Sequence, residues 1–341
     1  MSESGSSTPE PRGNPALLGH EAAEAALLEA MRTGRMHHAW LITGPDGVGK
    51  ATLAFRFARR LLAGLPPGAG LHLDPGSPVF RRVAAGTHAD LLTVEREWDE
   101  KRKRTRTEIV VEDVRAVSDF LRLTPAEGGW RVVVVDGAEH LNRNAANALL
   151  KVLEEPPSRA LLLLVSASPG RLPPTIRSRC RRLRLMPLDD APMAELLRRY
   201  LPEMDVAEHA RLSGLAEGSP GRALGLAAAE GLKLAGLAEE VLHAVPDFPL
   251  LRAYDLADAL ARAEGGFATF MDLLRAGLAR AVREAVRGQA DPAQARLAAL
   301  RPLDAWGDVW HALTRLQDDT ERLNLDKRQA IVSGIALLNG S

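Results

Sequence analysis

Hydrophobic and polar positions divide the chain into a first part of mixed periodicity and a second part that is helical throughout. Between residues 16 and 186, short apolar runs that suit buried strands alternate with segments whose apolar residues recur at helical spacing. Such alternation is typical of an α/β domain built on a mostly parallel sheet. The pattern predicts strands at 39–43, 90–95, 108–111, 131–135, 160–165 and 183–185, helices at 20–32, 50–62, 113–121 and 142–153, and a Gly- and Pro-rich loop at 65–78.

Beyond Pro187 the strand pattern ends, and apolar residues recur only at helical spacing. Three such segments, separated by proline and glycine, predict a small three-helix unit at 191–200, 206–215 and 221–230. A further boundary is expected near Val245 and Pro246, after which residues 250–339 are again helical by pattern. Trp306, Trp310 and Leu313 share one stripe there, which is typical of a bundle core rather than of a ligand site.

These boundaries divide the chain into four regions, of which the first is polar and rich in Pro, Gly and Ser. A segment of that composition cannot bury enough apolar surface to fold on its own. We therefore expect a disordered tail at 1–15, an α/β domain at 16–186, a helical lid at 187–245 and an all-helical domain at 246–341.

Composition narrows the functional classes without selecting one. Lys and Arg number 44 against 44 Asp and Glu, and this zero net charge argues against a general coat of positive charge for nucleic acid, though not against a local basic patch. Cys180 is the only cysteine, so an internal disulfide or cysteine zinc site is excluded, and we expect a small buried residue there. No apolar run approaches the ~20 residues that span a bilayer, and no signal peptide is recognisable, so we expect a cytoplasmic protein with no membrane partner.

The segment GPDGVGKAT at 44–52 lies between a predicted strand and a predicted helix, which is the context that a phosphate-binding loop requires. Backbone N–H groups and the helix N-terminus cradle phosphates in such a loop, glycines let the backbone approach the anion, and a lysine reaches the terminal phosphates. A glycine-rich turn without a ligand is the alternative, which the lysine and the flanking elements disfavour. The candidate nucleotide-binding residues are Gly44, Pro45, Asp46, Gly47, Val48, Gly49, Lys50, Ala51 and Thr52.

Two groups that hydrolysis requires are absent from this loop and from a neighbouring strand. The position after the lysine calls for a hydroxyl on Mg²⁺ but is Ala51, and Thr52 lies about 100° further round the helix. Asp136 ends a buried strand, where a Mg²⁺-directing carboxylate belongs, yet the next residue, where many such ATPases carry the carboxylate that polarises water, is Gly137. We interpret Glu139 as a solvated turn position or a helix cap. The sequence therefore predicts an impaired ATPase with no metal site.

Four segments occur in the same order as in bacterial clamp-loader subunits of the AAA+ class: HHAWLITGPDGVGKATLA, RVVVVDGAEHLNRNAANALLKVLEEPP, LPPTIRSRC and GSPGRAL. The chain resembles in particular the delta-prime family of DNA polymerase III, strongly over 17–224 and only in length and helical character beyond. The resemblance implies an AAA+ P-loop domain, a three-helix lid and an all-α collar domain. It also implies a role in DNA replication within the polymerase holoenzyme, with delta and gamma/tau subunits in a hetero-pentameric ring, the sliding clamp and primer-template DNA as partners.

The resemblance assigns roles to three further residues. Arg179 matches the arginine of the family's SRC motif, which projects into the nucleotide site of a neighbouring subunit; an arginine supplied in trans can be worth ~10³–10⁵ in rate. Its alternative is an ordinary arginine in a basic strip. Ser166 matches the residue that senses the terminal phosphate, and Arg222 matches the arginine that the lid contributes to a nucleotide, although either could serve packing between domains. The nucleotide would be ATP or ADP, and the sequence leaves open whether either is bound.

Two further segments bear on cofactors and partners. Some relatives carry a four-cysteine zinc module after the phosphate-loop helix, but residues 63–88 contain no cysteine, and we expect no zinc. The run KRKRTR at 101–106 is the densest basic cluster, and its acidic flanks favour a solvated hairpin loop over a nucleic-acid site.

Three interpretations of function remain. The first is a delta-prime-like stator, largely unable to hydrolyse ATP, that completes a neighbour's site and helps to load the clamp. The second is an active ATPase motor like the gamma/tau subunits, which Ala51, Gly137 and the lack of a long C-terminal extension weaken. The third is an unrelated P-loop kinase, which leaves the SRC and GSPGRAL segments unexplained.

Overall fold

Two compact units, Met1–Leu224 and Gly225–Ser341, make up the chain in the computed structural model. The structure describes residues 10–65, 68, 70–100, 104–127, 129–263 and 265–340, and each unit is considered by itself. The division between the units falls inside the third helix of the predicted lid. The domain boundaries at 186 and 245 therefore stay predictions.

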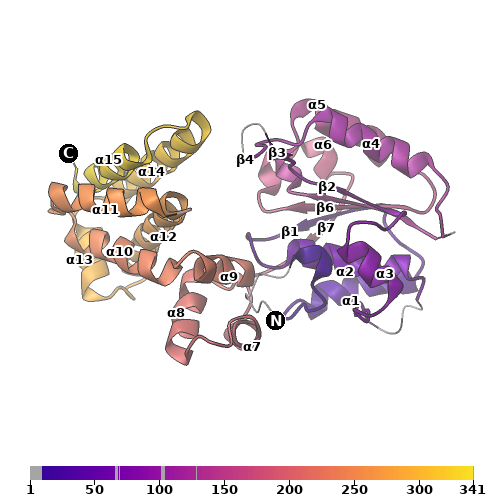
Figure 1. The fold of residues 1–341 in the computed structure, drawn as a ribbon, viewed down its shortest axis with the longest axis horizontal. Coiled ribbons are helices and arrows are strands. Elements are labelled where there is room, and N and C mark those ends of the chain that lie inside the picture. Colours follow the sequence, from indigo (N-terminus) through magenta and orange to yellow (C-terminus); the bar gives the residue numbers. More distant parts are fainter. Residues whose placement is uncertain are drawn as a thin grey trace. The chain divides into compact units, whose positions relative to one another are not determined.

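A five-stranded parallel sheet forms the centre of the first unit, with its strands in the order β2-β5-β6-β1-β7 (Figure 1). The central strands are buried along nearly their whole length because helices cover both faces, which explains their unbroken apolar runs. Five of the predicted strands are confirmed to within two residues at their ends. They are β1 (Ala39–Thr43), β2 (Leu91–Val94), β5 (Arg131–Asp136), β6 (Ala160–Ser166) and β7 (Arg181–Arg184).

Helices lie on both faces of this sheet (Figure 1). One face carries α1 (Glu21–Arg32), α2 (Lys50–Leu62) and α3 (Pro78–Ala84), and α2 packs directly against β1, β5 and β6. The other face carries α4 (Val111–Arg122) and α5 (Arg143–Glu154), whose apolar sides share one core with the strands, and the short α6 (Pro174–Arg177). The four predicted helices of this domain are confirmed to within two residues at their ends.

Helix α3 has no counterpart in the sequence prediction, which places a loop up to residue 78. The helix begins at Pro78, and Ser77 caps it, because the Ser77 side chain accepts a hydrogen bond from Phe80 N at 3.2 Å. A serine followed by a proline is a helix-start signal, and here the neighbouring glycines and prolines obscured it.

The predicted strand at 108–111 is wrong. Ile109 forms only an isolated bridge to Leu141, and Val111 is already the first residue of α4. The side chain of Asp113 accepts a hydrogen bond from Val110 N at 2.9 Å, which fixes the start of the helix. Three β-branched residues in a row suit a strand, but a run this short cannot outweigh a capped helix that follows at once.

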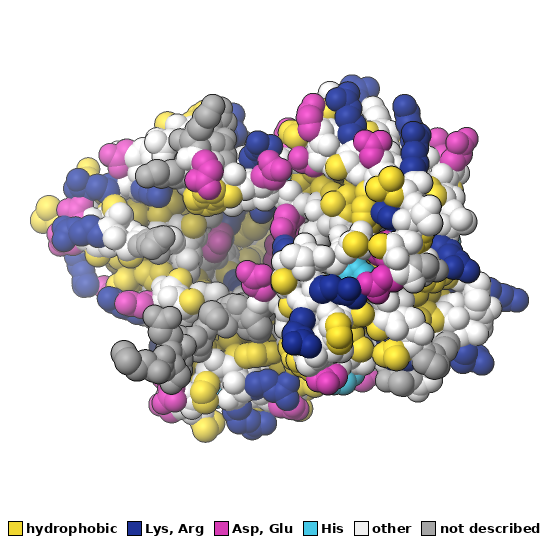
Figure 2. Space-filling model, turned by 45° about the vertical axis from the view of Figure 1, so that its right-hand side comes forward, with side chains coloured by type: hydrophobic (Ala, Val, Ile, Leu, Met, Phe, Trp, Pro, Cys, Tyr) yellow, Lys and Arg dark blue, Asp and Glu magenta, His cyan; other side chains and the backbone are white. Residues whose placement is uncertain are grey.

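The predicted hairpin around the basic run has a short antiparallel pair at its base, formed by β3 (Trp98–Asp99) and β4 (Arg104–Thr105). Residues 101–103 lie outside the described residues. Arg106 forms an exposed ion pair with Glu97 at 2.9 Å, in keeping with the mixed charge of the segment. Figure 2 likewise shows basic and acidic side chains interspersed over the visible face rather than gathered into fields of one sign.

The predicted disordered tail at 1–15 needs correction at its end, because residues 10–15 pack against α2. Within them Pro11–Gly13 forms a 3₁₀ helix, η1, which contacts α2 and α3. Arg56 donates a hydrogen bond to the Pro15 carbonyl and pairs with Glu24 of α1 at 2.9 Å. Backbone carbonyls of the segment thus accept hydrogen bonds from arginines of α2. Residues 1–9 lie outside the described residues.

Arg59 of α2 is the main anchor of this segment. Its side chain is only 1% exposed, and it donates hydrogen bonds to the carbonyls of Arg12 at 2.6 Å and Asn14 at 2.7 Å. Its guanidinium also lies 4.4 Å from the ring centre of Phe80 in α3. Burial lowers the pKa of Arg59 to about 10, so the group is still cationic at neutral pH. A buried cation of this kind requires such acceptors, and a polar tail supplies them.

Three helices follow the sheet where the sequence predicts the lid, and the second unit is a helical bundle. The lid segments are α7 (Asp190–Tyr200), α8 (Val206–Ala216) and α9 (Pro220–Ala228). The bundle consists of α10 (Gly231–Ala244), α11 (Leu250–Arg262), α12 (Gly266–Val286), α13 (Pro292–Ala299), α14 (Leu303–Leu323) and α15 (Lys327–Asn339). Trp306 and Leu313 are buried in its core and Trp310 is half-buried, as the predicted stripe requires. Among the described helices, none is long and apolar enough to cross a membrane.

Replacing Arg59 tests whether the N-terminal segment depends on this buried cation. We expect Arg59→Ala to destabilise the chain by about 2–4 kcal/mol, since it leaves a cavity and two carbonyls without their donor. The control Arg32→Ala removes an exposed arginine that pairs with Glu29 at 2.7 Å, and should change stability little. Urea denaturation of both variants decides the matter, and equal midpoints would show that Arg59 is no anchor.

Candidate nucleotide-binding site

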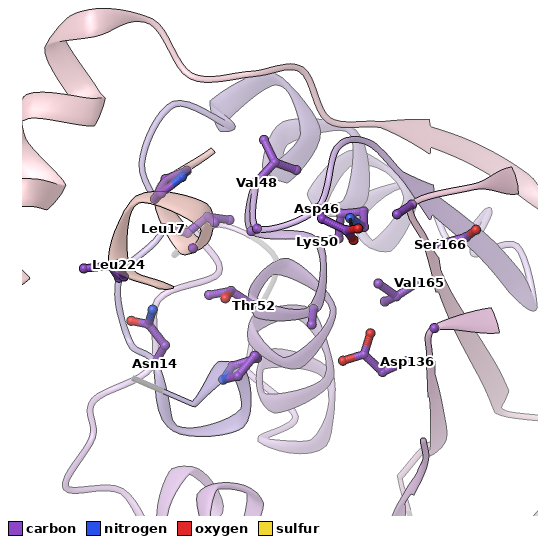
Figure 3. A pocket seen from close by; sticks show the side chains of 18 of the residues that line it. Asn14, Leu17, Asp46, Val48, Lys50, Thr52, Asp136, Val165, Ser166 and Leu224 are labelled. Atoms are coloured by element: carbon purple, nitrogen blue, oxygen red, sulfur yellow. Dashed lines mark ion pairs between the residues drawn. The ribbon is translucent and has the colours of Figure 1, made fainter. Parts of the chain in front are cut away.

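A cavity of about 570 Å³ opens in the first unit at the carboxyl ends of the parallel strands. Asp136 at the end of β5 and Ser166 at the end of β6 line it, opposite the loop that precedes α2 (Figure 3). Ligands of open α/β sheets bind at this edge, and a volume of roughly 300–1,000 Å³ suits a small molecule. The structure therefore brings the candidate phosphate loop, Asp136 and Ser166 together around one cavity.

The loop from Gly44 to Gly49 depends on glycine at three positions, since all three have a positive φ. At Gly44 an added Cβ would lie 2.5 Å from the Leu185 carbonyl oxygen, and at Gly47 it would lie 2.6 Å from Arg222 N. Gly49 is the last residue before α2 begins at Lys50. The N–H groups of the loop therefore lie next to the N-terminus of a helix. This geometry fits the phosphates of a nucleotide.

Lys50 is held by its own loop. Its side chain is 7% exposed, and Nζ donates a hydrogen bond to the Pro45 carbonyl at 2.7 Å and lies 3.6 Å from Asp46 Oδ1. Burial lowers the pKa of Lys50, whereas the carboxylates of Asp46, Glu139 and Asp136 oppose that effect. A phosphate that reached this ammonium group would compete with contacts that already satisfy it.

The start of α9 closes over the same loop. Gly221 N donates a hydrogen bond to the Gly47 carbonyl at 2.8 Å, and an added Cβ at Gly221 would lie 2.9 Å from Gly47 Cα. Two glycines thus meet backbone to backbone within the first unit. The loop and the lid helix are therefore joined without any side chain between them.

The groups that would hold a metal ion do not assemble. Ala51 offers a methyl group, and Figure 3 shows Thr52 and Asp136 on opposite sides of the first turn of α2. Burial raises the pKa of Asp136, and the nearby carboxylate of Glu95 adds to that effect. Within the described residues, no group of three or more His, Cys, Asp or Glu could hold a metal. These residues do not fit Mg²⁺ bound as hydrolysing P-loop proteins bind it.

The backbone conformation at position 137 suits glycine. Its φ is +73°, a conformation that residues with a Cβ rarely adopt, and an added Cβ would lie 3.0 Å from Cδ2 of the His140 ring. A glutamate at this position would therefore be strained and obstructed. The turn after β5 therefore favours glycine over a residue with a side chain at this position.

Glu139 is not the solvated turn position that the sequence suggests. It lies half-buried on the cavity wall in a 3₁₀ turn, η3 (Ala138–His140), and its Oε1 accepts a hydrogen bond from Ala167 N at 2.9 Å. Burial alone would raise the pKa of Glu139, but hydrogen bonds from its own N–H and from Ala167 outweigh burial and lower it. Glu139 therefore ties the turn after β5 to the end of β6.

One wall of the cavity is apolar, and of its residues the sequence predicts only Val48 as a site residue. It consists of Leu17 from the segment before α1, Val48 from the loop, and Leu196 and Leu224 from the lid helices. Asn14 and Tyr200 close one side, because Tyr200 Oη donates to Asn14 Oδ1 at 3.1 Å. Apolar residues at helical spacing look like ordinary core, so no local signal marks them. The wall is suited to an aromatic base.

Ser166 and Arg222 have different relations to the cavity. Ser166 is fully buried on its wall beside Glu139, and its hydroxyl helps to lower the pKa of that carboxyl group. Arg222 does not line the cavity; its Nη1 lies 3.7 Å from Glu217 Oε2, and its backbone packs on Gly47. The structure brings the first of these candidates to the site and turns the side chain of the second elsewhere.

Arg179 lies outside this cavity, in the turn between α6 and β7. Its side chain is 37% exposed, with Nη2 2.8 Å from Glu154 Oε1 and Nη1 donating to the Thr175 carbonyl at 3.0 Å. The neighbouring Cys180 is buried, as the sequence predicts. Burial raises the pKa of its thiol to about 12. The thiol is therefore protonated at neutral pH and is no nucleophile.

The parallel sheet, the glycine loop before α2 and the cavity at the strand ends define a P-loop nucleotide-binding fold. A sequence model of the family described as DNA polymerase III, delta subunit, matches residues 19–189. DNA polymerase III subunit delta' of Escherichia coli is 33% identical over 303 residues, which cover 86% of this chain and 87% of that protein. The chain belongs to this family of DNA polymerase III subunits.

Two further relatives align over shorter stretches. Subunit delta' of Pseudomonas aeruginosa is 42% identical over 184 residues, covering 54% of this chain and 53% of that protein. Subunit tau of Salmonella typhimurium is 35% identical over 216 residues, covering 62% of this chain and 32% of that protein. The chain thus spans about half the length of the first of these relatives and about a third of the second.

The contact between the loop and the lid can be tested within one helix. Gly221→Ala should destabilise the chain by about 1–3 kcal/mol, because its Cβ meets backbone that cannot move aside. Gly225→Ala, also in α9, places its Cβ in open space and should be neutral or stabilising by up to about 1 kcal/mol. Thermal denaturation measures both, and an equal effect of the two changes would contradict the contact.

Restoring the missing groups by substitution should fail. In Ala51→Thr combined with Gly137→Glu, the new glutamate must adopt φ near +73° beside the His140 ring, and such strain costs about 1–3 kcal/mol. We expect Mg²⁺-dependent ATP hydrolysis by the purified double variant to stay at the level of the unaltered chain. A rise to about one turnover per second would show that only the side chains, and not the backbone, limit this site.

Proposed function

We propose that this chain is a delta-prime-like subunit of a bacterial DNA polymerase III clamp loader, which completes the nucleotide site of a neighbouring subunit instead of hydrolysing ATP itself. The observation that carries the proposal is the position of Arg179. Its guanidinium is presented to solvent away from the chain's own cavity, and two contacts hold it in place. The chain's own site meanwhile has Ala51 and Gly137 at two positions that would handle metal and water.

The chemistry of this role is electrostatic. When phosphoryl transfer occurs in a neighbouring site, negative charge develops on the equatorial oxygens of the transferred group. A planar guanidinium presents several N–H donors to those oxygens, and it acts without losing or gaining a proton. Arg179 would supply these donors, while the neighbour would supply the phosphate loop, the metal and the attacking water. Ser178 and Cys180 would serve only to place it.

The chain's own cavity would hold ATP or ADP without turning it over. The N–H groups of the loop from Asp46 to Gly49 and the Lys50 side chain would bind the phosphates, and the apolar wall around Leu17 would take the base. Bound nucleotide would supply anionic phosphate to that cradle. Ser166, whose side chain is buried on the cavity wall, would be a further donor there. Arg222 would have to leave Glu217 to take part.

Family membership supports the remaining parts of the proposal. The partners would be the delta and gamma/tau subunits in a hetero-pentameric ring, with the sliding clamp and primer-template DNA bound through the complex during replication. The helical bundle of the second unit would serve as the collar that joins the subunits. Zero net charge suits a protein that meets DNA as one member of a ring rather than by a basic surface of its own.

The alternative is an active motor subunit, which the 35% identity to subunit tau of Salmonella typhimurium favours. A motor must bind Mg²⁺ and polarise water, and Ala51 and the constrained Gly137 provide neither function. ATP hydrolysis by the purified chain distinguishes the two. Metal-dependent turnover near one per second would favour the motor.

Removing the exposed guanidinium tests the proposed function directly. In a reconstituted complex, Arg179→Ala should slow hydrolysis at the completed site by ~10³-fold or more, so that the fast phase of a DNA-stimulated single-turnover assay loses the share of one site. The control Arg182→Ala removes an exposed arginine three residues further on and should leave that amplitude unchanged. Gel filtration checks that both complexes assemble. An unaltered fast phase in an assembled Arg179→Ala complex would refute the role in trans.

A further inference from the structure

Glu154, the last residue of α5, forms an ion pair with Arg179. Their side chains come from different elements, and Arg179 Nη2 lies 2.8 Å from Glu154 Oε1. The two side chains are 37% and 50% exposed, so the pair lies at the surface and can be reached by another subunit. None of the roles assigned above to the nucleotide site or to Arg179 explains why a carboxylate should lie here.

The backbone on both sides of this pair is fixed by one hydrophobic core. Leu153, directly before Glu154, and Cys180, directly after Arg179, belong to the same buried cluster, together with Ile176 of α6. His38 Nε2 also lies 3.1 Å from the Leu153 carbonyl oxygen and secures the end of α5. The two partners of the pair therefore project from anchored positions, and their separation is set by packing rather than by mobile loops.

The contacts also fix the direction of the guanidinium. Nη1 donates to the Thr175 carbonyl at 3.0 Å and Nη2 faces Glu154, so both ends of the group are held. A guanidinium carries five N–H donors, and two contacts leave others free for an anion. A long arginine side chain that is already oriented loses less conformational freedom when a phosphate arrives.

We propose that Glu154 is a positioning residue for Arg179, which holds the guanidinium in the direction required by a neighbour's phosphate. The inference rests on the proposed function of Arg179 in trans. A positioning role and a purely stabilising role predict different effects when Glu154 is replaced. Because an exposed ion pair contributes little to folding, loss of Glu154 should leave the chain as stable as before and still impair catalysis in the complex.

The experiment compares two adjacent glutamates. Glu154→Gln removes the charge that faces Arg179, and Glu155→Gln removes the same charge from the next, exposed residue. In the reconstituted complex we expect Glu154→Gln to lower kcat for DNA-stimulated hydrolysis at the completed site about three- to tenfold, with KM for ATP unchanged. Glu155→Gln should alter neither constant. Thermal denaturation of the free chains should give equal midpoints for both variants.

A double-variant cycle separates the two proposals. If Glu154 acts through Arg179, then Glu154→Gln should have no further effect in the Arg179→Ala background. Should Arg179→Ala slow hydrolysis while Glu154→Gln does not, the positioning role is wrong and the role of Arg179 stands. A faster rate with Glu154→Gln, or an equal loss in both backgrounds, would also overturn the positioning role. An unaltered rate with Arg179→Ala would refute the proposed function itself.

Discussion

The hydrogen bond from Gly221 N to the Gly47 carbonyl is the contact on which the arrangement of the site depends. It exists because neither residue has a Cβ, so the phosphate loop and the first turn of α9 approach backbone to backbone. The lid thereby holds the loop in a glycine-dependent conformation. The side chain of Lys50 also stabilises this loop, because its Nζ donates a hydrogen bond to the Pro45 carbonyl. The cradle is consequently complete as a structure before any phosphate enters.

The metal and water side of the cavity is shaped by backbone as much as by side chains. Gly137 turns the chain after β5 with a positive φ, which brings the His140 ring beside the glycine and turns Glu139 towards Ala167 N. The Glu139 carboxylate therefore connects the turn after β5 to the residue that follows β6.

The sequence predicts those parts of the molecule whose physical causes are local. Strand 39–43 and helix 50–62 match their observed bounds, because an apolar run, a glycine loop and a strong helical period leave few alternatives. Helix α3 and the stretch at 108–111 are misjudged where glycines, prolines or a brief β-branched run mask a helix start. These errors are confined to short segments and leave the order of the elements intact.

The missed parts of the site share a different cause, since each depends on residues far apart in the chain. The polar segment at 10–15 is ordered by Arg59, some 45 residues away, whose buried charge needs its carbonyls. The apolar wall joins Leu17 to Leu224 across the whole first unit. The sequence around Glu139 suggests an exposed residue because its hydrogen-bond donor, Ala167 N, is distant in the chain. Tertiary contacts of this kind leave no local pattern.

A side chain that acts in another subunit faces two opposing physical demands. It must be exposed, because its target lies outside its own chain, and it must be rigid, because a misplaced charge stabilises little. Arg179 meets both demands through its neighbours: the backbone at Ile176 and Cys180 is anchored in the core, while the guanidinium is held at the surface by a carbonyl and by Glu154. Under the proposed function, the core that anchors Ile176 and Cys180 would therefore serve the neighbouring site as well as its own fold.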